Sequence, residues 1–196
     1  GRRRGLIGPF GLTKIEGRLE RSSRPLSCET FGSGAIQRRM SELAFRIVEF
    51  SPAYAEAWRT LNEAWLAEGG FAVEAKDRKV LDDPQGQILT QGGRIYFIER
   101  AGEAVGCCAL MAMDDGGFEV VKMTIAPAAR GQGLSRRLLE ACEAAAREVN
   151  APRLYLETSS TLGPALALYD SFGFVRLPPR ETPYVRADVF MEKTLG

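Results

Sequence analysis

The fold is decided by the stretch from Glu119 to Cys142, which reads EVVKMTIAPAARGQGLSRRLLEAC. Its first part, Val120 to Ile125, is rich in β-branched residues and is followed by Pro127, which predicts a strand that ends before the proline. After the glycines, apolar residues recur at spacings of one, three and four, as on one helix face. These residues are Leu134, Leu138, Leu139, Cys142, Ala145, Ala146 and Val149. The stretch therefore predicts a strand, a turn and a helix.

The turn between strand and helix, Arg130 to Gly133, carries two glycines and one cation. Glycines directly before a helix let backbone N–H groups approach a ligand, and the helix N-terminus adds a positive dipole end. Arg130 adds forked donors. The turn predicts a phosphate or pyrophosphate site; the alternative is a turn that uses glycine for its geometry alone.

Three better-known motifs do not fit this turn. A Walker A loop needs a lysine between Gly133 and Ser135, where Leu134 stands. A dinucleotide fingerprint needs a small residue three positions after Gly133, where Arg136 stands. A nucleophile elbow needs glycine two positions after Ser135, where Arg137 stands. These motifs are excluded.

The stretch resembles motif A of the GNAT superfamily, the Gcn5-related N-acetyltransferases. That motif is a strand, Val/Ile-x-Pro, Arg/Gln-x-x-Gly-x-Gly/Ala and a helix, and here it is Ile125-x-Pro127 and Arg130-x-x-Gly133-x-Ser135. Ser135 stands where glycine or alanine is usual. The resemblance implies that the turn holds the pyrophosphate of coenzyme A. The implied cofactor residues are Thr124, Ile125, Arg130, Gly131, Gln132, Gly133, Leu134 and Ser135.

A second motif near the C-terminus extends the resemblance to about residues 43–195. Tyr169-x-x-x-Gly173-Phe174 matches the family's Tyr-x-x-x-Gly-Phe ending, with Ala165 four positions before the tyrosine. Leu162 stands where many members have asparagine. We interpret this difference as a contact to the cofactor or substrate that is missing here, or that Ser159, Ser160 or Thr161 makes instead.

Histidine is absent from the 196 residues. This excludes Ser-His-Asp, Cys-His and histidine-ligated metal chemistry, so a general base must be a carboxylate, cysteine, lysine, tyrosine or water. The length suits one domain with a sizeable core. No apolar run reaches the ~18 residues of a membrane span.

The four cysteines show no Cys-x-x-Cys spacing for a metal, and no metal is predicted. Cys107 and Cys108 are adjacent in an expected strand and should point to opposite faces. We interpret the cysteines as small apolar residues of a protein in a reducing compartment, the cytoplasm.

Residues 1–39 differ from the rest of the chain. They hold seven glycines, and eight Arg and one Lys against three Glu give a charge of +6, which leaves −5 for the remainder of a chain at +1. We expect a disordered basic leader, derived from cloning or from translated upstream sequence, with Met40 as the natural start. Residues 40–196 would form the GNAT acetyltransferase domain.

The remaining elements follow the GNAT order. The helix after Ser51 and Pro52 has a proline at its first position. The segment after the long helix follows a helical crossover and should lie parallel to Val120–Ile125. The resemblance implies an α/β fold with a mixed sheet of about seven strands and helices on both faces. The other expected strands are 43–50, 94–99, 104–113, 154–158, 174–177 and 188–193, and the other expected helices begin at Val73 and Pro164.

Glu119 is the candidate general base, because it takes the position of the catalytic glutamate in the histone acetyltransferase branch of the family. By strand alternation it would share one face with Val121, Met123 and Ile125. The alternative is a solvated glutamate at a strand start. Glu157 is the second candidate base, and a chain of waters is a third route.

Tyr169 is the candidate acid, because a phenol is protonated at neutral pH and can hydrogen-bond the departing sulfur. Its alternative is a core aromatic residue. The resemblance also implies that the strands ending near Ile125 and Leu156 splay apart, that the pantetheine arm lies in the gap, and that the Ile125 N–H is the oxyanion donor.

The sequence thus predicts an acetyl-CoA-dependent N-acetyltransferase that moves an acetyl group directly to a primary amine. The acceptor, a small amine, an antibiotic or a protein amine, is left open, and so is a homodimer. Acetyl-CoA is the cofactor, and neither nucleic acid nor membrane is an expected partner. The alternatives are a non-catalytic CoA-binding regulatory module and a nucleic-acid-binding protein that uses the leader.

Overall fold

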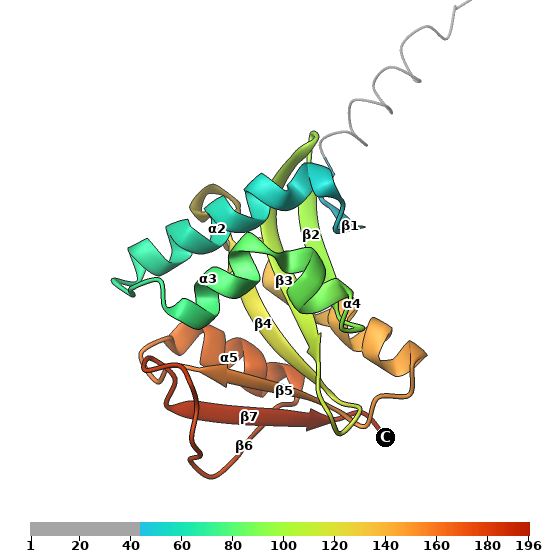
Figure 1. The fold of residues 1–196 in the computed structure, drawn as a ribbon, viewed down its shortest axis with the longest axis vertical. Coiled ribbons are helices and arrows are strands. Elements are labelled where there is room, and N and C mark those ends of the chain that lie inside the picture. Colours follow the sequence, from blue (N-terminus) through green and yellow to red (C-terminus); the bar gives the residue numbers. More distant parts are fainter. Residues whose placement is uncertain (1–43) are drawn as a thin grey trace, which may run out of the picture.

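The computed structural model describes residues 44–196. The predicted leader, residues 1–39, lies outside them, and so does the nucleic-acid alternative that depends on it. Seven strands form one mixed sheet in the order β1-β2-β3-β4-β5-β7-β6 (Figure 1). The strands are β1 Arg46–Glu49, β2 Arg94–Arg100, β3 Glu103–Ala112, β4 Phe118–Ile125, β5 Arg153–Thr158, β6 Val175–Arg176 and β7 Val189–Thr194. The predicted seven-stranded mixed sheet is confirmed.

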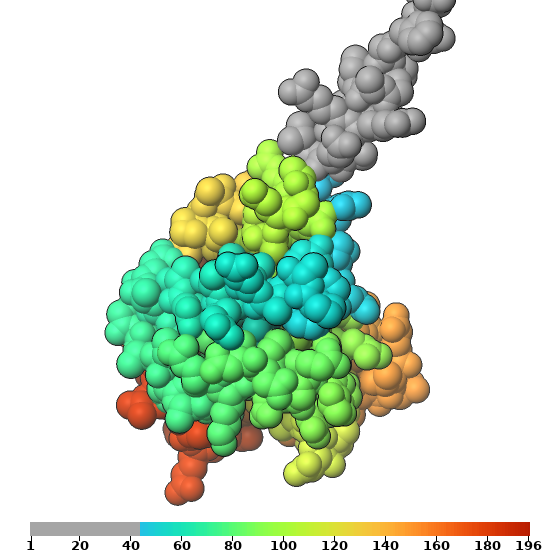
Figure 2. Space-filling model, turned by 45° about the horizontal axis from the view of Figure 1, so that its top comes forward, coloured from blue at the N-terminus to red at the C-terminus, as the bar shows by residue number. Residues whose placement is uncertain are grey.

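Helices cover both faces of the sheet, as predicted. On one face α2 (Ala55–Glu68) and α3 (Ala75–Asp82) enclose a core around Trp58 and Phe97, and they form the near side of the space-filling view (Figure 2). On the other face α4 (Leu134–Glu148) and α5 (Gly163–Phe172) pack on a larger core. The adjacent Cys107 and Cys108 point into these two separate cores.

Three short helical turns complete the described chain. Two are 3-10 turns, η1 (Pro52–Tyr54) and η3 (Pro127–Ala129), each opened by a proline. The third, η2 (Gln85–Leu89), is a π-helical turn that the sequence did not predict. A five-residue turn between Pro84 and Thr90 is too short to leave a periodic apolar pattern. None of the helices in 44–196 is long and apolar enough to cross a membrane.

β4 and β5 run parallel, as predicted, but they pair over a very short length. The register joins Phe118 to Leu154 and Glu119 to Tyr155 and goes no further. β5 pairs instead with β7 along its whole length, from Arg153 to Thr158. The C-terminal half of β4 therefore separates from β5.

A β-bulge bends β4 where it leaves β5. Val121 pairs with Ala109 and Thr124 with Cys107, so two residues of β4, Lys122 and Met123, oppose only one residue of β3. Lys122 has a φ of 56°, in the left-handed region. The extra residue reverses the alternation of side chains along the strand.

The predicted common face of Glu119, Val121, Met123 and Ile125 is therefore wrong. Val121 packs against the core under α2 and α3, whereas Met123 and Ile125 pack against the core under α4. Glu119 precedes the bulge and shares the face of Val121. One strand thus places side chains on both sides of the gap.

We predict that Gly106→Ala destabilises the fold. A Cβ at Gly106 would lie 2.4 Å from Cδ1 of Ile125 and 2.9 Å from the carbonyl oxygen of Thr124. Relief of such overlap costs about 1–3 kcal/mol, and each kcal/mol lowers Tm by ~2–4 °C in a chain of this size. The measurement is thermal unfolding by circular dichroism.

Gly163→Ala is the matched control, because a Cβ at Gly163 meets no atom within 4 Å. It should leave Tm unchanged or slightly higher. Equal Tm values for the two variants would show that β3 and β4 can separate at Gly106 without cost.

Candidate active site

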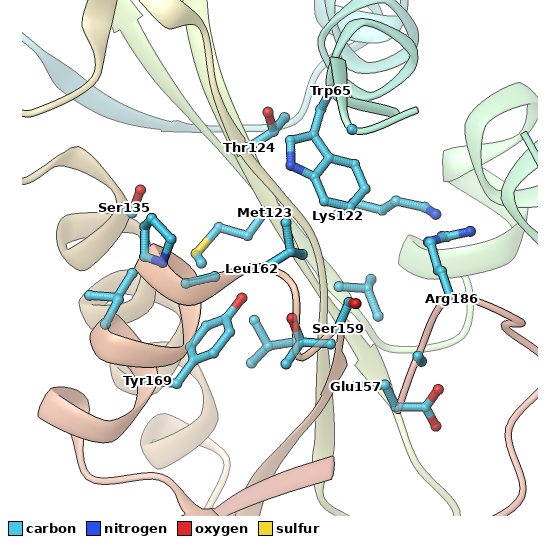
Figure 3. Close-up of a pocket in the computed structure, with 18 of the residues that line it drawn as sticks. Trp65, Lys122, Met123, Thr124, Ser135, Glu157, Ser159, Leu162, Tyr169 and Arg186 are labelled. Carbon is cyan, nitrogen blue, oxygen red and sulfur yellow. The ribbon is translucent and has the colours of Figure 1, made fainter. Parts of the chain in front are cut away.

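A cleft of about 530 Å³ opens where β4 and β5 separate. Its walls come from the C-terminal end of α2, the N-terminal half of α5 and the loop between β6 and β7, residues 177–188 (Figure 3). A second hollow of about 330 Å³ follows the turn before α4 and shares Ile125, Arg130 and Ser135 with the cleft. The two together make one continuous groove across the end of the sheet.

The turn before α4 presents backbone to the second hollow. Gly131 and Gly133 have φ values of 75° and 71°, and Gly133 is the N-cap of α4. A Cβ on either glycine would meet no atom within 4 Å, so the open side of the turn faces free space. The first N–H groups of a helix have no partner within the helix. This end of α4 is therefore suited to an anion.

The predicted cofactor residues do not all face this groove. Thr124, Ile125, Arg130 and Ser135 line the cleft, and Gly131, Gly133 and Leu134 line the second hollow. Gln132 lines neither, and its side-chain amide donates a 3.3 Å hydrogen bond to the Ala129 carbonyl.

Arg130 is held by other protein groups. Its Nη1 donates to Oε1 of Glu68 at 2.6 Å, and its Nε donates to the Ile125 carbonyl at 3.0 Å. The hydrogen bond from Arg130 lowers the pKa of Glu68 and raises that of Arg130 in turn. Through these contacts Arg130 ties the end of α2 to the turn.

Glu119 lies in the cleft, on the side toward α2 and α3. Burial raises the pKa of its carboxyl; nearby Lys76 lowers it, and nearby Glu157 raises it further. The influences on Glu119 are burial and charges at a distance, so no hydrogen bond from residues 44–196 holds this carboxylate. A carboxyl with a raised pKa that is free to take a proton has the properties of a base.

Glu157 lies on the same face of the sheet as Glu119. Glu119 is in register with Tyr155, and Glu157 follows two positions later on β5. The Tyr155 hydroxyl donates to Glu157 Oε1 at 3.1 Å, and the Thr182 hydroxyl donates to Oε2. Two donors fix Glu157 in place, whereas Glu119 is free. The two candidate bases thus differ in the hydrogen bonds that hold them.

Tyr169 lies across the cleft from Glu157, on α5, with its hydroxyl pointing into the cleft (Figure 3). The residue is 8% exposed, and its ring packs edge-on against Phe174 at 5.8 Å. Burial, and then nearby Cys108, raise the pKa of the phenol well above its usual value. The side chain is therefore a protonated donor at neutral pH.

An ionic cluster at the cleft edge was not predicted. Asp77 of α3 pairs with Lys122 of β4 and with Arg186 of the 177–188 loop, and Arg186 also pairs with Glu74. Hydrogen bonds from Arg186 and Lys122 overcome the effect of burial and lower the pKa of Asp77. The sequence offered two signals: a lysine inside an apolar strand, and the Glu74-x-x-Asp77 capping box at the start of α3.

Comparison with known proteins agrees with this architecture. The acetyltransferase (GNAT) family model matches residues 50–174. The chain is 34% identical to the N-acetyltransferase YjgM of Escherichia coli K12 over 130 residues, 63% of this chain and 75% of YjgM. It is 39% identical to an IAA acetyltransferase of Azospirillum brasilense over 105 residues, 52% of this chain and 68% of that protein.

Among solved structures, YncA of Salmonella typhimurium with its cofactor acetyl-CoA superposes with a TM-score of 0.64 at 22% identity, over 78% of this chain and 95% of YncA. The fold and the groove are those of an acetyl-CoA-dependent acyltransferase. The chain belongs to the GNAT family and is an acetyl-CoA-dependent N-acetyltransferase.

We predict that Gly133→Val weakens acetyl-CoA binding by about two orders of magnitude. The added branch would fill the open side of the turn, and valine resists the φ of 71°. Loss of two charge-assisted hydrogen bonds at ~1.5 kcal/mol each corresponds to a roughly 100-fold weaker Kd. Isothermal titration calorimetry with acetyl-CoA is the measurement.

Gly102→Val is the control. Gly102 lies in the β2–β3 turn with a φ of 85°, and a Cβ there also meets nothing within 4 Å. It carries the same backbone strain away from the groove, so its acetyl-CoA affinity should equal that of the wild type. Wild-type affinity in a folded Gly133→Val variant would remove the turn from the cofactor site.

Proposed function

We propose that this enzyme transfers the acetyl group directly from acetyl-CoA to a small cationic primary amine. The observation that carries the proposal is the placement of two carboxylates, Glu119 and Glu157, on one side of the cleft and the phenol of Tyr169 on the other. The pyrophosphate would lie on the turn before α4, with Gly131 and Gly133 allowing close approach.

The pantetheine arm would run along the free edge of β4 and pair with its backbone as an added strand. The Ala126 N–H donates to the Val105 carbonyl of β3 at 2.8 Å. Because N–H groups alternate along a strand, the preceding Ile125 N–H points the other way, toward the cleft. This orientation supports the Ile125 N–H as the donor to the thioester oxygen.

The proton steps follow from the two sides of the cleft. Glu119 takes a proton from the ammonium, and the neutral amine nitrogen attacks the thioester carbon. The carbonyl oxygen becomes an oxyanion beside the Ile125 N–H. The C–S bond then breaks, and the sulfur receives its proton from Tyr169. The former amine nitrogen loses its second proton to water, and water returns a proton to the Tyr169 phenolate. The products are the N-acetyl amine and coenzyme A.

The charges around the acceptor side favour a cation. The cations that line the cleft there, Lys122 and Arg186, are paired with Asp77 and Glu74. The carboxylates Glu119 and Glu157 have no cationic partner within ion-pair distance among residues 44–196. An acceptor that adds a carboxylate next to its amine would meet these two carboxylates.

We predict that the enzyme prefers an amine to the amino acid from which it differs only by a carboxylate. Tyramine against tyrosine and cadaverine against lysine are suitable pairs. Like-charge repulsion of ~1.4 kcal/mol or more makes kcat/KM at least roughly tenfold higher for the amine. The measurement is thiol release from acetyl-CoA.

The control variant is Glu157→Gln. It should reduce the ratio of kcat/KM between amine and amino acid, because it removes one of the two carboxylates that repel the amino acid. A preference for the amino acids would instead assign Lys76 and Arg186 to a carboxylate of the acceptor. Absence of thiol release with every amine would contradict the proposed function itself.

We predict that Glu119→Gln lowers kcat by ~10²–10⁴-fold near neutral pH and that the loss shrinks at high pH, where more of the amine is already neutral. In the wild type, burial raises the pKa of Glu119, so kcat/KM should fall as pH drops through that raised pKa and the carboxylate gains a proton. The measurement is a pH–rate profile.

Tyr169→Phe is the contrasting variant. It should lower kcat with acetyl-CoA affinity unchanged, because the lost interaction grows in the transition state, and high pH should not rescue it. An unaffected rate in Glu119→Gln would move the base to Glu157 or to water. A Glu119→Gln loss that is constant with pH would make Glu119 a group that binds the acceptor.

A further inference from the structure

Asp77 joins three separate segments at the edge of the cleft. Its carboxylate is fully buried and accepts from four donors. Nη1 and Nη2 of Arg186 donate at 2.9 and 2.7 Å, the Glu74 N–H donates at 3.0 Å, and Nζ of Lys122 donates as well. The carboxylate thus links the start of α3, the 177–188 loop and the bulge of β4.

Of these three segments, the bulge depends most on Asp77. Arg186 retains Glu74 as a second partner, and α3 retains the Glu74 half of its capping box. Lys122, whose side chain is 7% exposed, pairs with Asp77 alone among the ion pairs of residues 44–196. Lys122 is also the residue with the unfavourable φ of 56°. A strained conformation persists only where its surroundings hold it.

The conformation of Lys122 decides which backbone groups of β4 face the cofactor. Without the extra residue of the bulge, the alternation beyond Val121 would shift by one position. The Thr124 N–H would then point toward the cleft, and the Ile125 N–H would point toward β3. The Ile125 N–H therefore faces the cleft only while the bulge is kept.

We infer that Asp77 is a positioning residue for acetyl transfer. It holds Lys122 in the left-handed conformation, keeps the bulge in β4, and so directs the Ile125 N–H to the thioester oxygen. The inference rests on the proposed function, because it needs the oxyanion to form at this N–H. Asp77 itself acts through Lys122 and contacts neither acetyl group nor amine.

The test compares Lys122→Gly with Lys122→Ala. Both remove the ammonium, but glycine adopts a φ of 56° freely, whereas alanine populates it roughly tenfold less. At saturating acetyl-CoA, kcat should be about tenfold higher for Lys122→Gly than for Lys122→Ala. Their Kd values for acetyl-CoA should agree within about twofold, because the turn before α4 is untouched.

A second experiment uses the Asp77→Asn variant. It should lower kcat by roughly tenfold or more with unchanged acetyl-CoA affinity, and the addition of Lys122→Gly should recover part of that loss. A merely structural Asp77 would lower Tm in both backgrounds and give no recovery. Equal kcat for Lys122→Gly and Lys122→Ala, or a double variant no faster than Asp77→Asn, would overturn the inference.

A readout independent of turnover separates this inference from the proposed function. Backbone NMR chemical shifts of residue 122 report its φ. They should indicate the left-handed conformation in the wild type and in Lys122→Gly, and a mixture in Asp77→Asn. A left-handed residue 122 retained in full by Asp77→Asn would overturn the inference even if no amine acceptor were found.

Discussion

The short pairing between β4 and β5 is the constraint on which the rest of this structure depends. Parallel neighbours normally share hydrogen bonds along their common length, but here the register ends at Glu119 and Tyr155. Beyond that point the inward backbone groups of β4 have no strand partner, and such groups need one when they are buried. A ligand with amides of its own can supply that partner, and we propose this role for the pantetheine arm of acetyl-CoA.

The bulge at Lys122 gives the two sides of the gap different chemistry. Before it, β4 directs Glu119 toward the side of α2 and α3, where Glu157 also lies. After it, β4 directs Met123 and Ile125 toward the core under α4 and α5, which holds Tyr169. A regular strand would place Glu119 and Ile125 on one face. The single extra residue therefore separates a side that carries two carboxylates from a largely apolar side, as the proposed mechanism requires for the amine and the thioester.

Most of this architecture could be predicted because it depends on local sequence. Apolar periodicity, glycine and proline positions and the GNAT order together predicted the strands and α-helices of residues 44–196 within a few residues, and Gly131 and Gly133 marked the turn. The bulge could not be predicted, because Lys122 reads as an ordinary strand residue until Asp77 is placed beside it. The two lie 45 positions apart, and no pattern of periodicity links them.

The pairing of Arg130 with Glu68 was missed for the same reason. From sequence, Arg130 is a free cation beside a phosphate-binding turn, and only the fold brings the end of α2 within reach of it. The positions of Tyr169 and Glu119 in the cleft were easier to predict, because each follows from one element. Tyr169 lies on the helix before Gly173-Phe174, and Glu119 lies on the strand before the turn; their catalytic roles stay predictions. Residues that depend on one element can be predicted; residues that depend on a contact between elements cannot.

Because the chain has no histidine, a proton in its active site must be taken by a group whose ordinary pKa lies away from neutral pH or by water. A carboxylate has an ordinary pKa near ~4, far below that of an ammonium, so it is a weak base unless burial raises that pKa. Burial does raise the pKa of Glu119.

This raised pKa also affects stability. When the pH exceeds the pKa that the carboxyl has in the unfolded chain, the unfolded state gains from ionisation and the folded state gains less, so the fold becomes less stable. Placing Glu119 at the partly buried end of the short β4–β5 pairing therefore trades stability at neutral pH for basicity. In the mechanism we propose, the ammonium of the acceptor would neutralise the ionised Glu119 carboxylate at the cleft wall and offset part of this cost.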